Sequence, residues 1–536
     1  MTAPIGASPP QRHAVLAIDL GSSGVKTAVV NDSGEVVASA EASIATYFLP
    51  GGGAEQDPHI WWEGVRQTAR KAIAASGIPP DGIAAVACDS QWSVVVPVDD
   101  GGRPLMQAVH WLDTRGGPYN RILMNGFPRV AGYGIFNLLR WIRRTGLAPT
   151  LSGVDSLGHV LFIKHAYPEI YARTHAFLEP MDFLTSRLTG RITATQKTMA
   201  PFAITDNRQW GGTEYSRTLL QQAGLEKAKF PPLIANDGVV GPLAPGVAED
   251  LGLPSSTPVV AGISDSNATL IGSGAVEDFE SIISIGTSLY MTCHLPFKKT
   301  DLAHFMTALP SPFPNRYYLL GEQGAGGKCI EFFLKHLVYP DDDFQTGPEP
   351  EDAYHRFNIM AEAAPAGSGG VIFLPWLNGA IVPSEAPHVR GGFINLSLGT
   401  TRRHMARAVM EAVAFNNRWT RRPAERFIRR PIPYFRLSGG GAQSDLWSQI
   451  HADVLQVPIH QVADPVNATV RGTALLALST LGYLAPEDIP RRVTIKRVFE
   501  PNRAHQTLYD KMYRQYRKLF RRNKSIFTAL NTETKR

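Results

Sequence analysis

Short apolar runs separated by glycine-rich turns open the chain. AVLAIDL, from Ala14, has the continuous apolar pattern of a buried strand and leads into a GSSG loop. VKTAVV and EVVASAEA follow as two further strand patterns, joined at 31–34 by NDSG, a sequence typical of a hairpin turn. Another apolar run, IAAVACDS from Ile83, predicts one more strand. Roughly the first 115 residues therefore predict the sheet of a first lobe.

The same plan returns in the second half of the chain. Between about residues 138 and 220 the pattern is amphipathic and helical, and strands reappear at VVAGIS and SIISIGTSLYMTC. The latter again places an apolar strand before a glycine–hydroxyl cluster and another apolar strand, a weak echo of the first unit rather than a sequence repeat. We therefore predict an α/β protein of two lobes, residues 13–258 and 259–522.

Two further segments belong to the predicted second lobe. RRHMARAVMEAVAFNNRW, from Arg402, carries its apolar residues on one face of a long helix. FRLSGGGAQSDLWSQIHADVL, from Phe435, predicts a strand, a glycine turn and a helix. Ser444 or Asp445 would cap that helix.

Composition places the chain among soluble globular proteins. It has 536 residues, of which 44% are hydrophobic and 19% charged, enough for two or more cores. Cys88, Cys293 and Cys329 form no CxxC pair, so we expect neither a disulfide framework nor a structural zinc site, and we expect a cytoplasmic location. The N-terminus lacks the pattern of a signal peptide, and no stretch reaches the ~20 apolar residues of a membrane span. No membrane partner is expected.

Basic residues cluster at two places, although the net charge is only +6. They are RWTRRPAERFIRR (418–430) and KMYRQYRKLFRRNK (511–524), and the second is interleaved with aromatic residues, as in some nucleic-acid-binding segments. Tyr509, Tyr513, Tyr516 and Phe520, however, fall on one helical face. This pattern favours a C-terminal helix docked by its aromatic side, and nucleic acid is not an expected partner.

The first candidate for chemistry is the loop at 21–24. Its glycines and serines offer backbone N–H groups and hydroxyls to an anion, and Lys26 adds a positive charge. Asp19 stands just before the loop at the end of a strand, where burying a carboxylate is costly without a metal ion or a hydrogen-bond network. Strand ends that face a cleft are where α/β sheets collect ligands.

Asp265 repeats this placement at the end of VVAGIS. The Gly286–Thr287–Ser288 turn lies a short hairpin away, and the glycines at 439–441 precede a predicted helix whose N-terminus would favour an anion. Together these features indicate phosphoryl transfer, in which a protein mainly positions reactants and stabilises charge. The 15 histidines show no HExxH spacing, which argues against a catalytic zinc site of that type.

These motifs resemble those of the FGGY carbohydrate kinases, the family that includes xylulokinase, ribulokinase and glycerol kinase, over about residues 15–518. DLGSSGVK (19–26) is similar to the family's first phosphate motif, SIGTS to its second, and SGGGAQSDLW to its adenosine motif. AVHWLDTR (108–115) resembles the sugar-site strand, and VVAGISDSNA carries Asp265 at the position of the catalytic base.

The resemblance implies two ribonuclease-H-like lobes of the actin-like ATPase type around a central cleft, with ATP and Mg²⁺ as cofactors. The sugar would bind mainly to the first lobe and the nucleotide to the second. Asp265 would accept the proton of the reacting sugar hydroxyl, and Asp19 and Asp265 would hold Mg²⁺. Residues implied in ATP binding are Asp19, Gly21, Ser22, Ser23, Lys26, Gly286, Thr287, Gly327, Gly440, Gly441, Ala442 and Asp445. Those implied in sugar binding are Gln91, Trp92, Ser93, Trp111, Asp113, Arg115 and Asp265.

The chain also departs from the family's usual residues. Trp92 and Ser93 stand where xylulokinases have Met and His, His159 and Phe162 where Lys and Trp are usual, and Asn395 where glycine is usual. The substrate is therefore left open between a pentulose such as xylulose and another ketose or a polyol, such as ribulose, glycerol or erythritol. A catalytically silent nucleotide- or sugar-binding sensor is the alternative from another class, and a homodimer is one option for the assembly.

Overall fold

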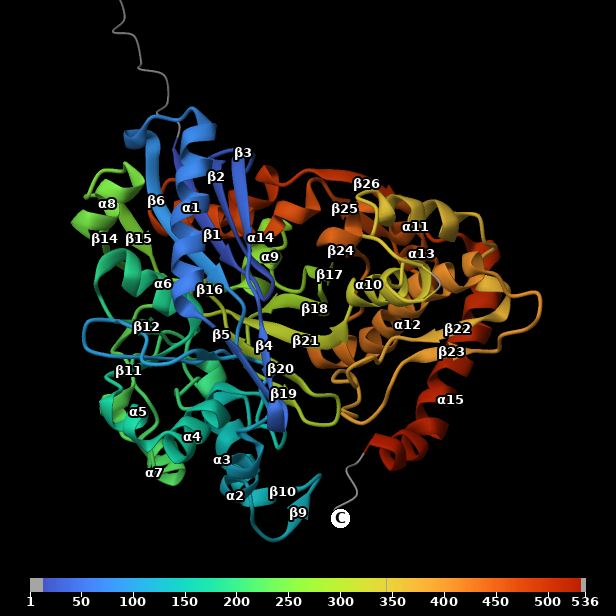
Figure 1. Cartoon of the computed structure of the whole chain (residues 1–536), viewed down its shortest axis with the longest axis horizontal. Coiled ribbons are helices and arrows are strands. Elements are labelled where there is room, and N and C mark those ends of the chain that lie inside the picture. The colour runs from blue at the N-terminus through green and yellow to red at the C-terminus, as the bar shows by residue number, and fades with distance from the viewer. Residues whose placement is uncertain (1–12, 344, 532–536) are drawn as a thin grey trace, which may run out of the picture.

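Two large β-sheets organise the molecule. The computed structural model describes residues 13–343 and 345–531. In Figure 1 the N-terminal sheet, blue apart from its green strands at 239–264, stands beside a second sheet that runs from green to orange, with helices packed against both. The α-helices are α1 (Pro58–Ser76), α2 (Gly117–Leu123), α3 (Ile135–Thr145), α4 (Ser156–Ala166), α5 (Pro168–Arg173), α6 (Pro180–Thr189), α7 (Arg217–Ala223), α8 (Pro245–Leu251), α9 (Asp265–Gly272), α10 (Lys328–Phe333), α11 (Ala353–Glu362), α12 (Arg402–Ile428), α13 (Asp445–Leu455), α14 (Ala468–Thr480) and α15 (Gln506–Asn531). The predicted α/β class is confirmed.

The first sheet is built around parallel strands at its centre. Its seven strands run in the order β14-β15-β6-β1-β2-β3, and β16 also pairs with β6. They are β1 (Ala14–Leu20), β2 (Gly24–Asn31), β3 (Val36–Ser43), β6 (Ile83–Ser90), β14 (Val239–Pro242), β15 (Pro258–Val260) and β16 (Ile263–Ser264). Because β1, β15 and β16 are all parallel to β6, the carboxyl ends of β1, β6 and β16 meet at one edge. The lobe boundary at residue 258 stays a prediction.

Alternation along β1 gives the sheet two buried faces. Leu16 and Ile18 belong to the hydrophobic cluster that α1 covers, whereas Val15 and Ala17 belong to the cluster that α14 covers. Because side chains alternate with a period of two, Asp19 shares the second face. A carboxylate at the end of β1 is thereby directed toward the side of the sheet on which α14 lies.

Short strands and helices fill the segments that connect the strands of the first sheet. The predicted helical stretch at 138–220 contains α4 to α6, most of α3 and the first part of α7. The minor strands are β4 (Tyr47–Leu49), β5 (Gly53–Gln56), β7 (Val96–Val98), β8 (Ala108–Val109), β9 (Arg129–Val130), β10 (Tyr133–Gly134), β11 (Ala176–Leu178), β12 (Ala194–Thr195) and β13 (Leu233–Ile234). β8 pairs with β5, which brings the predicted sugar segment beside Glu55 and Gln56.

The second sheet resembles the first in its centre. In the first sheet β1 is antiparallel to β2 and parallel to β6, and β17 takes the corresponding place in the second. Its order is β19-β20-β21-β18-β17-β24-β25-β26. The strands are β17 (Ser281–Ile285), β18 (Ser288–Leu295), β19 (Thr300–Asp301), β20 (Met306–Pro310), β21 (Tyr317–Ala325), β24 (Phe435–Ser438), β25 (Ile459–Val462) and β26 (Ile495–Phe499), with a separate pair β22 (Ile372–Leu374) and β23 (Gly392–Ile394). β17 is antiparallel to β18 and parallel to β24, which confirms both the predicted strand–glycine–strand unit and the strand before the GGGA turn.

Helices α9 and α14 cross where the two halves meet. A side chain at Gly272 would come 1.7 Å from the carbonyl oxygen of Ala468, and one at Gly472 would come 1.8 Å from that of Ala268. The two backbones are therefore in direct contact, and only glycine fits at either position. The crossing brings α14, from late in the sequence, onto the first sheet.

The C-terminal helix α15 lies against the second half by its aromatic side (Figure 1). Tyr509, Tyr516 and Phe520 are buried, with Tyr513 packed beside them, as the helical pattern predicted. Over the described ranges 13–343 and 345–531, the helices are all too short or too polar to cross a membrane.

Candidate active site

Three aspartates lie at the carboxyl ends of neighbouring parallel strands. Asp19 on β1 is the register partner of Asp89 on β6, and Asp89 is in turn paired with Ile263 on β16, two residues before Asp265. Asp89 is fully buried, whereas Asp19 and Asp265 are partly exposed. The side chains of Asp19 and Asp89 are within hydrogen-bonding reach of each other. Both predicted aspartates thus meet at one sheet edge, together with a third that the motifs did not single out.

Burial sets the charge state of this cluster. It raises the pKa of Asp265 to about 7, helped by the negative charge of Asp19 and opposed by the backbone N–H of Ser266, which donates to Asp265 Oδ1 at 2.6 Å. Burial also raises the pKa of Asp19 to about 6, against the lowering effects of the Asp89 hydrogen bond and of Lys26. Burial and the charge of Asp19 raise the pKa of Asp89 well above its ordinary value. A carboxyl with a pKa near 7 suits proton transfer at neutral pH.

The loop between β1 and β2 is closed by its own backbone. The N–H of Gly21 donates to the carbonyl oxygen of Gly24 at 2.9 Å. A side chain at Gly24 would come 2.7 Å from the carbonyl oxygen of Ala42, so this position accepts only glycine. Trp111 Nε1–H donates to Ser22 Oγ at 2.9 Å, while Ser23 is exposed. The predicted sugar segment and the predicted phosphate loop are therefore in contact.

Lys26 lies at the junction of the two halves. Its Nζ is 2.9 Å from Glu41 Oε1 and donates to Asn467 Oδ1 at 3.2 Å, just before α14. Lys26 is also the register partner of Asp19, and its charge lowers the pKa of that carboxyl. The side chain thus lies beside Asp19, and its contact with phosphate stays a prediction.

Three glycine segments of the second half lie against one another. The N–H of Gly327 donates to the carbonyl oxygen of Gly286 at 2.7 Å. The N–H of Gly326 donates to the carbonyl oxygen of Thr287 at 3.2 Å. A side chain at Gly439 would come 2.7 Å from the carbonyl oxygen of Ile285, whereas one at Gly440 would meet no described atom within 4 Å. The turn after β17, the end of β21 and the turn after β24 therefore form one small-residue surface, open at Gly440.

The start of α13 carries the last predicted nucleotide residues. Ser444 caps the helix, because its Oγ accepts the N–H of Trp447 at 3.0 Å. Gly441 and Ala442 lie in the turn before it, and Ala442 is buried. Asp445 accepts Gln461 Nε2–H at 2.9 Å and lies 3.1 Å from Lys496 Nζ. These two contacts lower the pKa of Asp445 and keep its carboxylate charged.

Gln91 lies in a buried chain of side-chain amides. Its Nε2–H donates to Gln56 Oε1 at 2.8 Å, and its Oε1 lies 3.0 Å from His110 Nε2. Gln56 Nε2–H in turn donates to the backbone oxygen of Ser22 at 2.8 Å. The predicted sugar residue Gln91 is thereby linked to the first glycine loop, through Gln56 and His110, which sequence reasoning missed.

Trp92 and Ser93 form a bend after β6. Ser93 has a positive φ of 61°, and the following N–H, that of Val94, donates to Glu179 Oε2 at 3.2 Å. Trp92 Nε1–H donates to the carbonyl oxygen of Thr198 at 3.1 Å, and its ring stacks on Tyr318 of β21 with centroids 6.3 Å apart. The bend therefore connects the first half to the second sheet.

Asp113 and Arg115 are paired with each other and with Glu55. Arg115 Nε–H donates to Asp113 Oδ2 at 2.8 Å, and its Nη2 lies 2.6 Å from Glu55 Oε1. Asp113 is fully buried, and its Oδ2 also accepts the N–H of Ala54 at 2.9 Å. In this structure the pair holds the Trp111 segment onto β5, and direct contact of either charge with a sugar stays a prediction.

Comparison with known proteins identifies the family. Residues 14–272 match the N-terminal domain, and residues 282–481 the C-terminal domain, of the FGGY family of carbohydrate kinases. The chain belongs to this family. It is a carbohydrate kinase.

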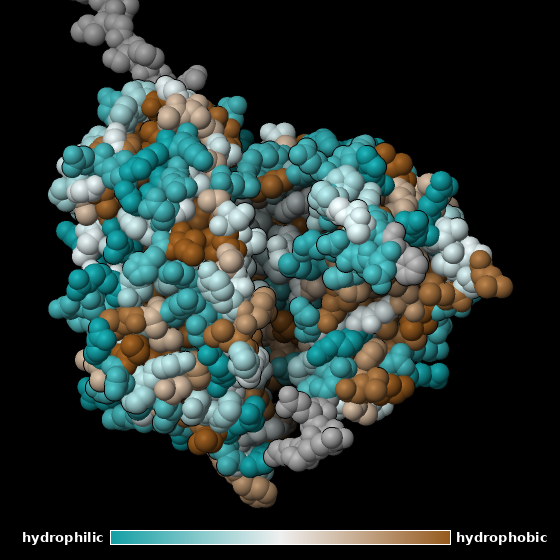
Figure 2. Space-filling model, viewed as in Figure 1, coloured by the Kyte–Doolittle hydropathy of each residue, from teal (hydrophilic) through white to brown (hydrophobic). Residues whose placement is uncertain are grey.

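Individual FGGY kinases are similar to the chain over almost its whole length. A xylulose kinase of Staphylococcus epidermidis is 26% identical over 529 residues, which cover 98% of this chain and 99% of that protein. A glycerol kinase of Thermus brockianus is 27% identical over 522 residues, covering 95% and 98%. The crystal structure of a ligand-bound xylulose kinase from Lactobacillus acidophilus superposes with a TM-score of 0.82 at 21% identity, covering 97% of this chain and 100% of that one. The predicted two-lobed, actin-like fold is confirmed, and Figure 2 shows a groove between the two halves on one face.

The positions at which this FGGY kinase departs from the usual pattern have local partners. Phe162 lies under the Arg115 guanidinium, 4.3 Å from carbon to ring centroid, and His159 Nε2 lies 3.2 Å from the carbonyl oxygen of Asp113. Asn395 has a positive φ of 67°, which asparagine tolerates better than most residues, and its Nδ2–H donates to the carbonyl oxygen of Gly370 at 3.0 Å. Each departure is accommodated by packing or hydrogen bonding.

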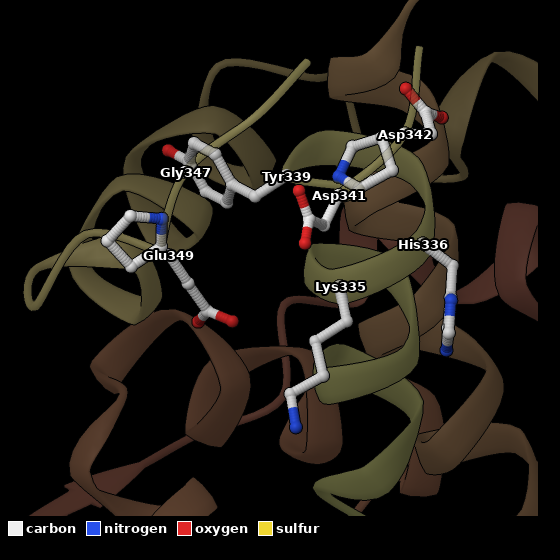
Figure 3. A pocket seen from close by; sticks show the side chains of 9 residues that line it. Lys335, His336, Tyr339, Asp341, Asp342, Gly347 and Glu349 are labelled. Carbon is white, nitrogen blue, oxygen red and sulfur yellow. The ribbon is translucent and has the colours of Figure 1, made fainter. Parts of the chain in front are cut away.

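A cavity of about 880 Å³ lies away from these residues, beyond the C-terminal end of α10. Figure 3 shows Lys335, Asp341 and Glu349 around its opening. None of the predicted site residues of this FGGY kinase lines it. The site is therefore assigned from the converging strand ends and glycine segments rather than from this cavity.

Proposed function

We propose that this FGGY kinase transfers the γ-phosphoryl group of ATP to a hydroxyl of a pentulose, with xylulose as the first candidate. The observation that carries the proposal is Asp265, a partly exposed carboxyl whose pKa is raised to about 7 beside Asp19. β18, which begins directly after Gly286 and Thr287, also lies close to this carboxyl, because the charge of Asp265 acts on Tyr290 of that strand. The xylulose kinases among the relatives support the choice of sugar.

In the proposed reaction Asp265 acts as general base. The sugar hydroxyl loses its proton to Asp265 as its oxygen attacks the γ-phosphorus, and the bond from that phosphorus to the β,γ-bridging oxygen breaks to release ADP. Backbone N–H groups of the glycine loops at 21–24 and at 286–287 would surround phosphate oxygens, and Gly440, which faces open space, would admit the nucleotide. The partial exposure of Asp265 leaves it accessible to the hydroxyl.

The carboxylates at the strand ends fit the Mg²⁺ that such a reaction uses. Hard oxygen donors are the ligands that Mg²⁺ prefers, and Asp19 supplies them next to the first glycine loop. Asp89 Oδ1 is buried without a hydrogen-bond partner among the described residues, which fits an oxygen that is free to bind a cation. When bound, Mg²⁺ would neutralise charge on the phosphates; Asp265 as one of its ligands stays a prediction.

The choice of sugar substrate depends on a few residues near the first glycine loop. Ser93 lies in a bend, Trp92 stacks on Tyr318, and Trp111 contacts the loop at 21–24. We propose that these three residues contact the sugar and select its shape. The glycerol kinase relative keeps a polyol, or another ketose, as the second candidate. A reducing cytoplasm fits the three buried, unpaired thiols of Cys88, Cys293 and Cys329. Assembly as a homodimer stays a prediction.

A phosphorylation screen tests the proposal. Purified protein is incubated with Mg²⁺–ATP and a panel containing xylulose, ribulose, erythritol, glycerol and gluconate, and ADP release is measured for each. We expect the highest kcat/KM with xylulose. A higher value for a polyol would replace the substrate and keep the reaction. Sugar binding by calorimetry with no ADP release from any acceptor would favour the sensor.

A further inference from the structure

Asp89 is a buried carboxylate to which the family motifs assign no role. It lies on the face of the first sheet that α14 covers, since Ala85 and Ala87 of the same strand belong to that cluster. Thr473 of α14 donates its hydroxyl hydrogen to Asp89 Oδ2. Asp89 Oδ1 is buried and has no hydrogen-bond partner among the described residues. One oxygen is thus fixed by α14, and the other is left open.

The charges that face Asp89 are negative. The negative charges of Asp19 and Asp265 both raise the pKa of Asp89, and the side chain of Asp19 is within hydrogen-bonding reach of it. The positively charged side chain beside Asp19 is that of Lys26, which already forms an ion pair with Glu41 and a hydrogen bond with Asn467. Two adjacent carboxylates with so little positive charge near them are costly to bury, so a bound cation or a shared proton must compensate them.

We infer that Asp19 and Asp89 together form a two-carboxylate site for a divalent cation, and that the cation occupies it before the nucleotide arrives. The inference rests on the proposed function in taking the resident cation to be Mg²⁺. Mg²⁺ is commonly held by one or two carboxylates, and waters and substrate phosphates complete its coordination. The hydrogen bond from Thr473 orients the Asp89 carboxylate, as partners of metal-binding carboxylates commonly do.

This assignment separates the cation from the general base. Across residues 13–343 and 345–531, no three side chains of the types His, Cys, Asp and Glu come close enough together to hold a metal ion. In this assignment Asp265 contributes a nearby negative charge to the pair and keeps its oxygens for the sugar proton. The pair differs from Asp19 and Asp265, the ligands that the family resemblance implied.

Mn²⁺ binding to the nucleotide-free full chain tests the inference. The loss of the electron paramagnetic resonance signal of free Mn²⁺ gives stoichiometry and affinity without sugar, ATP or turnover. We expect one Mn²⁺ per chain, displaced by Mg²⁺, and an affinity at least tenfold weaker in Asp89→Asn and in Asp19→Asn. The matched control is Asp265→Asn, which removes a nearby negative charge but no proposed ligand, so Mn²⁺ affinity should fall clearly less than in Asp89→Asn or Asp19→Asn. Equal affinities in wild type and Asp89→Asn would overturn the inference, as would an equal loss in Asp265→Asn.

Wild-type protein and Asp19→Asn decide the matter if the Asp89 variants do not fold. Bound Mn²⁺ should then raise the midpoint of thermal unfolding of wild type, and not that of Asp19→Asn. Wild type that binds no Mn²⁺ without nucleotide overturns the inference, and a proton shared by the two carboxyls then replaces it. Because these readouts involve no sugar, a kinase that phosphorylates xylulose but binds no Mn²⁺ alone leaves the proposed function standing.

Discussion

Asp265 joins two properties that rarely coincide at one residue, a buried setting and access to a reactant. Its pKa of about 7 makes it a proton acceptor at neutral pH, and it is the first residue of α9. Asp265→Asn should lower kcat by ~10²–10⁴-fold while nucleotide affinity changes little, because the amide cannot accept the proton. Steady-state kinetics and calorimetric titration of an ATP analogue measure the two effects. Asp100→Asn, at an exposed turn, is the matched control; more than about a tenth of wild-type turnover in Asp265→Asn would contradict the role.

The same carboxyls make stability depend on pH. Burial raises the pKa of Asp19 to about 6 and of Asp265 to about 7, above the value of about 4 in an unfolded chain. The folded metal-free protein therefore holds extra protons. This stabilisation is complete below about pH 4 and is lost as the pH rises through 7. Asp265→Asn should stabilise the metal-free protein by on the order of 1–3 kcal/mol at pH 8 and by little at pH 4. Thermal unfolding in a chelator checks this, and an equal effect at both pH values would contradict it.

Strand-end position was enough to find Asp19 and Asp265 in the sequence, because each is followed by residues that break the apolar pattern. Asp89 lies near the end of an equally apolar run, yet its place beside Asp19 comes from the register between β1 and β6, and its hydrogen bond comes from Thr473, 384 positions away. Glu179 was missed for the same reason. A periodic pattern predicts which face a residue takes, whereas partners from distant elements depend on the tertiary fold.

At the scale of elements, the bend after β6 is held by the residue that precedes α6. Glu179 is fully buried and accepts hydrogen bonds from the N–H of Val94 and from the hydroxyl of Ser156. Glu179→Leu leaves these buried donors unpaired, at a cost of about 1–3 kcal/mol, and should let Trp92 and Ser93 move. We expect KM for the sugar to rise roughly tenfold, as about 1.4 kcal/mol would give, and KM for ATP to change less than twofold.

Glu179→Gln is the matched test of this positioning role. Its amide oxygen still accepts a hydrogen bond, so KM for the sugar should return to near the wild-type value. If Glu179→Leu raised both KM values equally, or if Glu179→Gln behaved like the leucine variant, the bend would not be what Glu179 positions.

The crossing of α9 and α14 depends on two glycines. Gly472→Ala places a methyl group 1.8 Å from the carbonyl oxygen of Ala268, so the helices must separate. We expect a loss of more than about 3 kcal/mol in the free energy of unfolding, at the upper end of single substitutions. Gly246→Ala, in α8 with no described atom within 4 Å, is the matched control and should stabilise by about 0.5–1 kcal/mol. Urea unfolding compares the two, and similar midpoints would show that the crossing is loose.

At the scale of the whole molecule, the proposed reactants approach from different halves. The proposed sugar residues lie in the first half and most proposed nucleotide residues in the second, with a groove between the halves in Figure 2. Transfer requires the groove to close, which would also exclude water as a competing acceptor. We expect sugar and nucleotide to favour each other's binding by about 1–3 kcal/mol.

Calorimetric titration of the sugar, with and without a non-hydrolysable ATP analogue, measures this coupling. Small-angle scattering of the same mixtures should show a smaller radius of gyration when both ligands are present. Identical sugar affinities and an unchanged radius would contradict closure, even for an active kinase.

The position of α14 also bears on how the protein is made. The first sheet is complete in sequence by β16, yet the helix that covers one of its faces ends at Thr480, about 200 residues later. At about 5–20 residues per second, a ribosome needs on the order of 10–40 s to synthesise that stretch. Throughout this interval Val15, Ala17 and their neighbours form an apolar surface that lacks its native cover. We therefore expect the nascent first half to depend on chaperones until the last fifth of the chain emerges, and a fragment ending before α14 to aggregate when expressed alone.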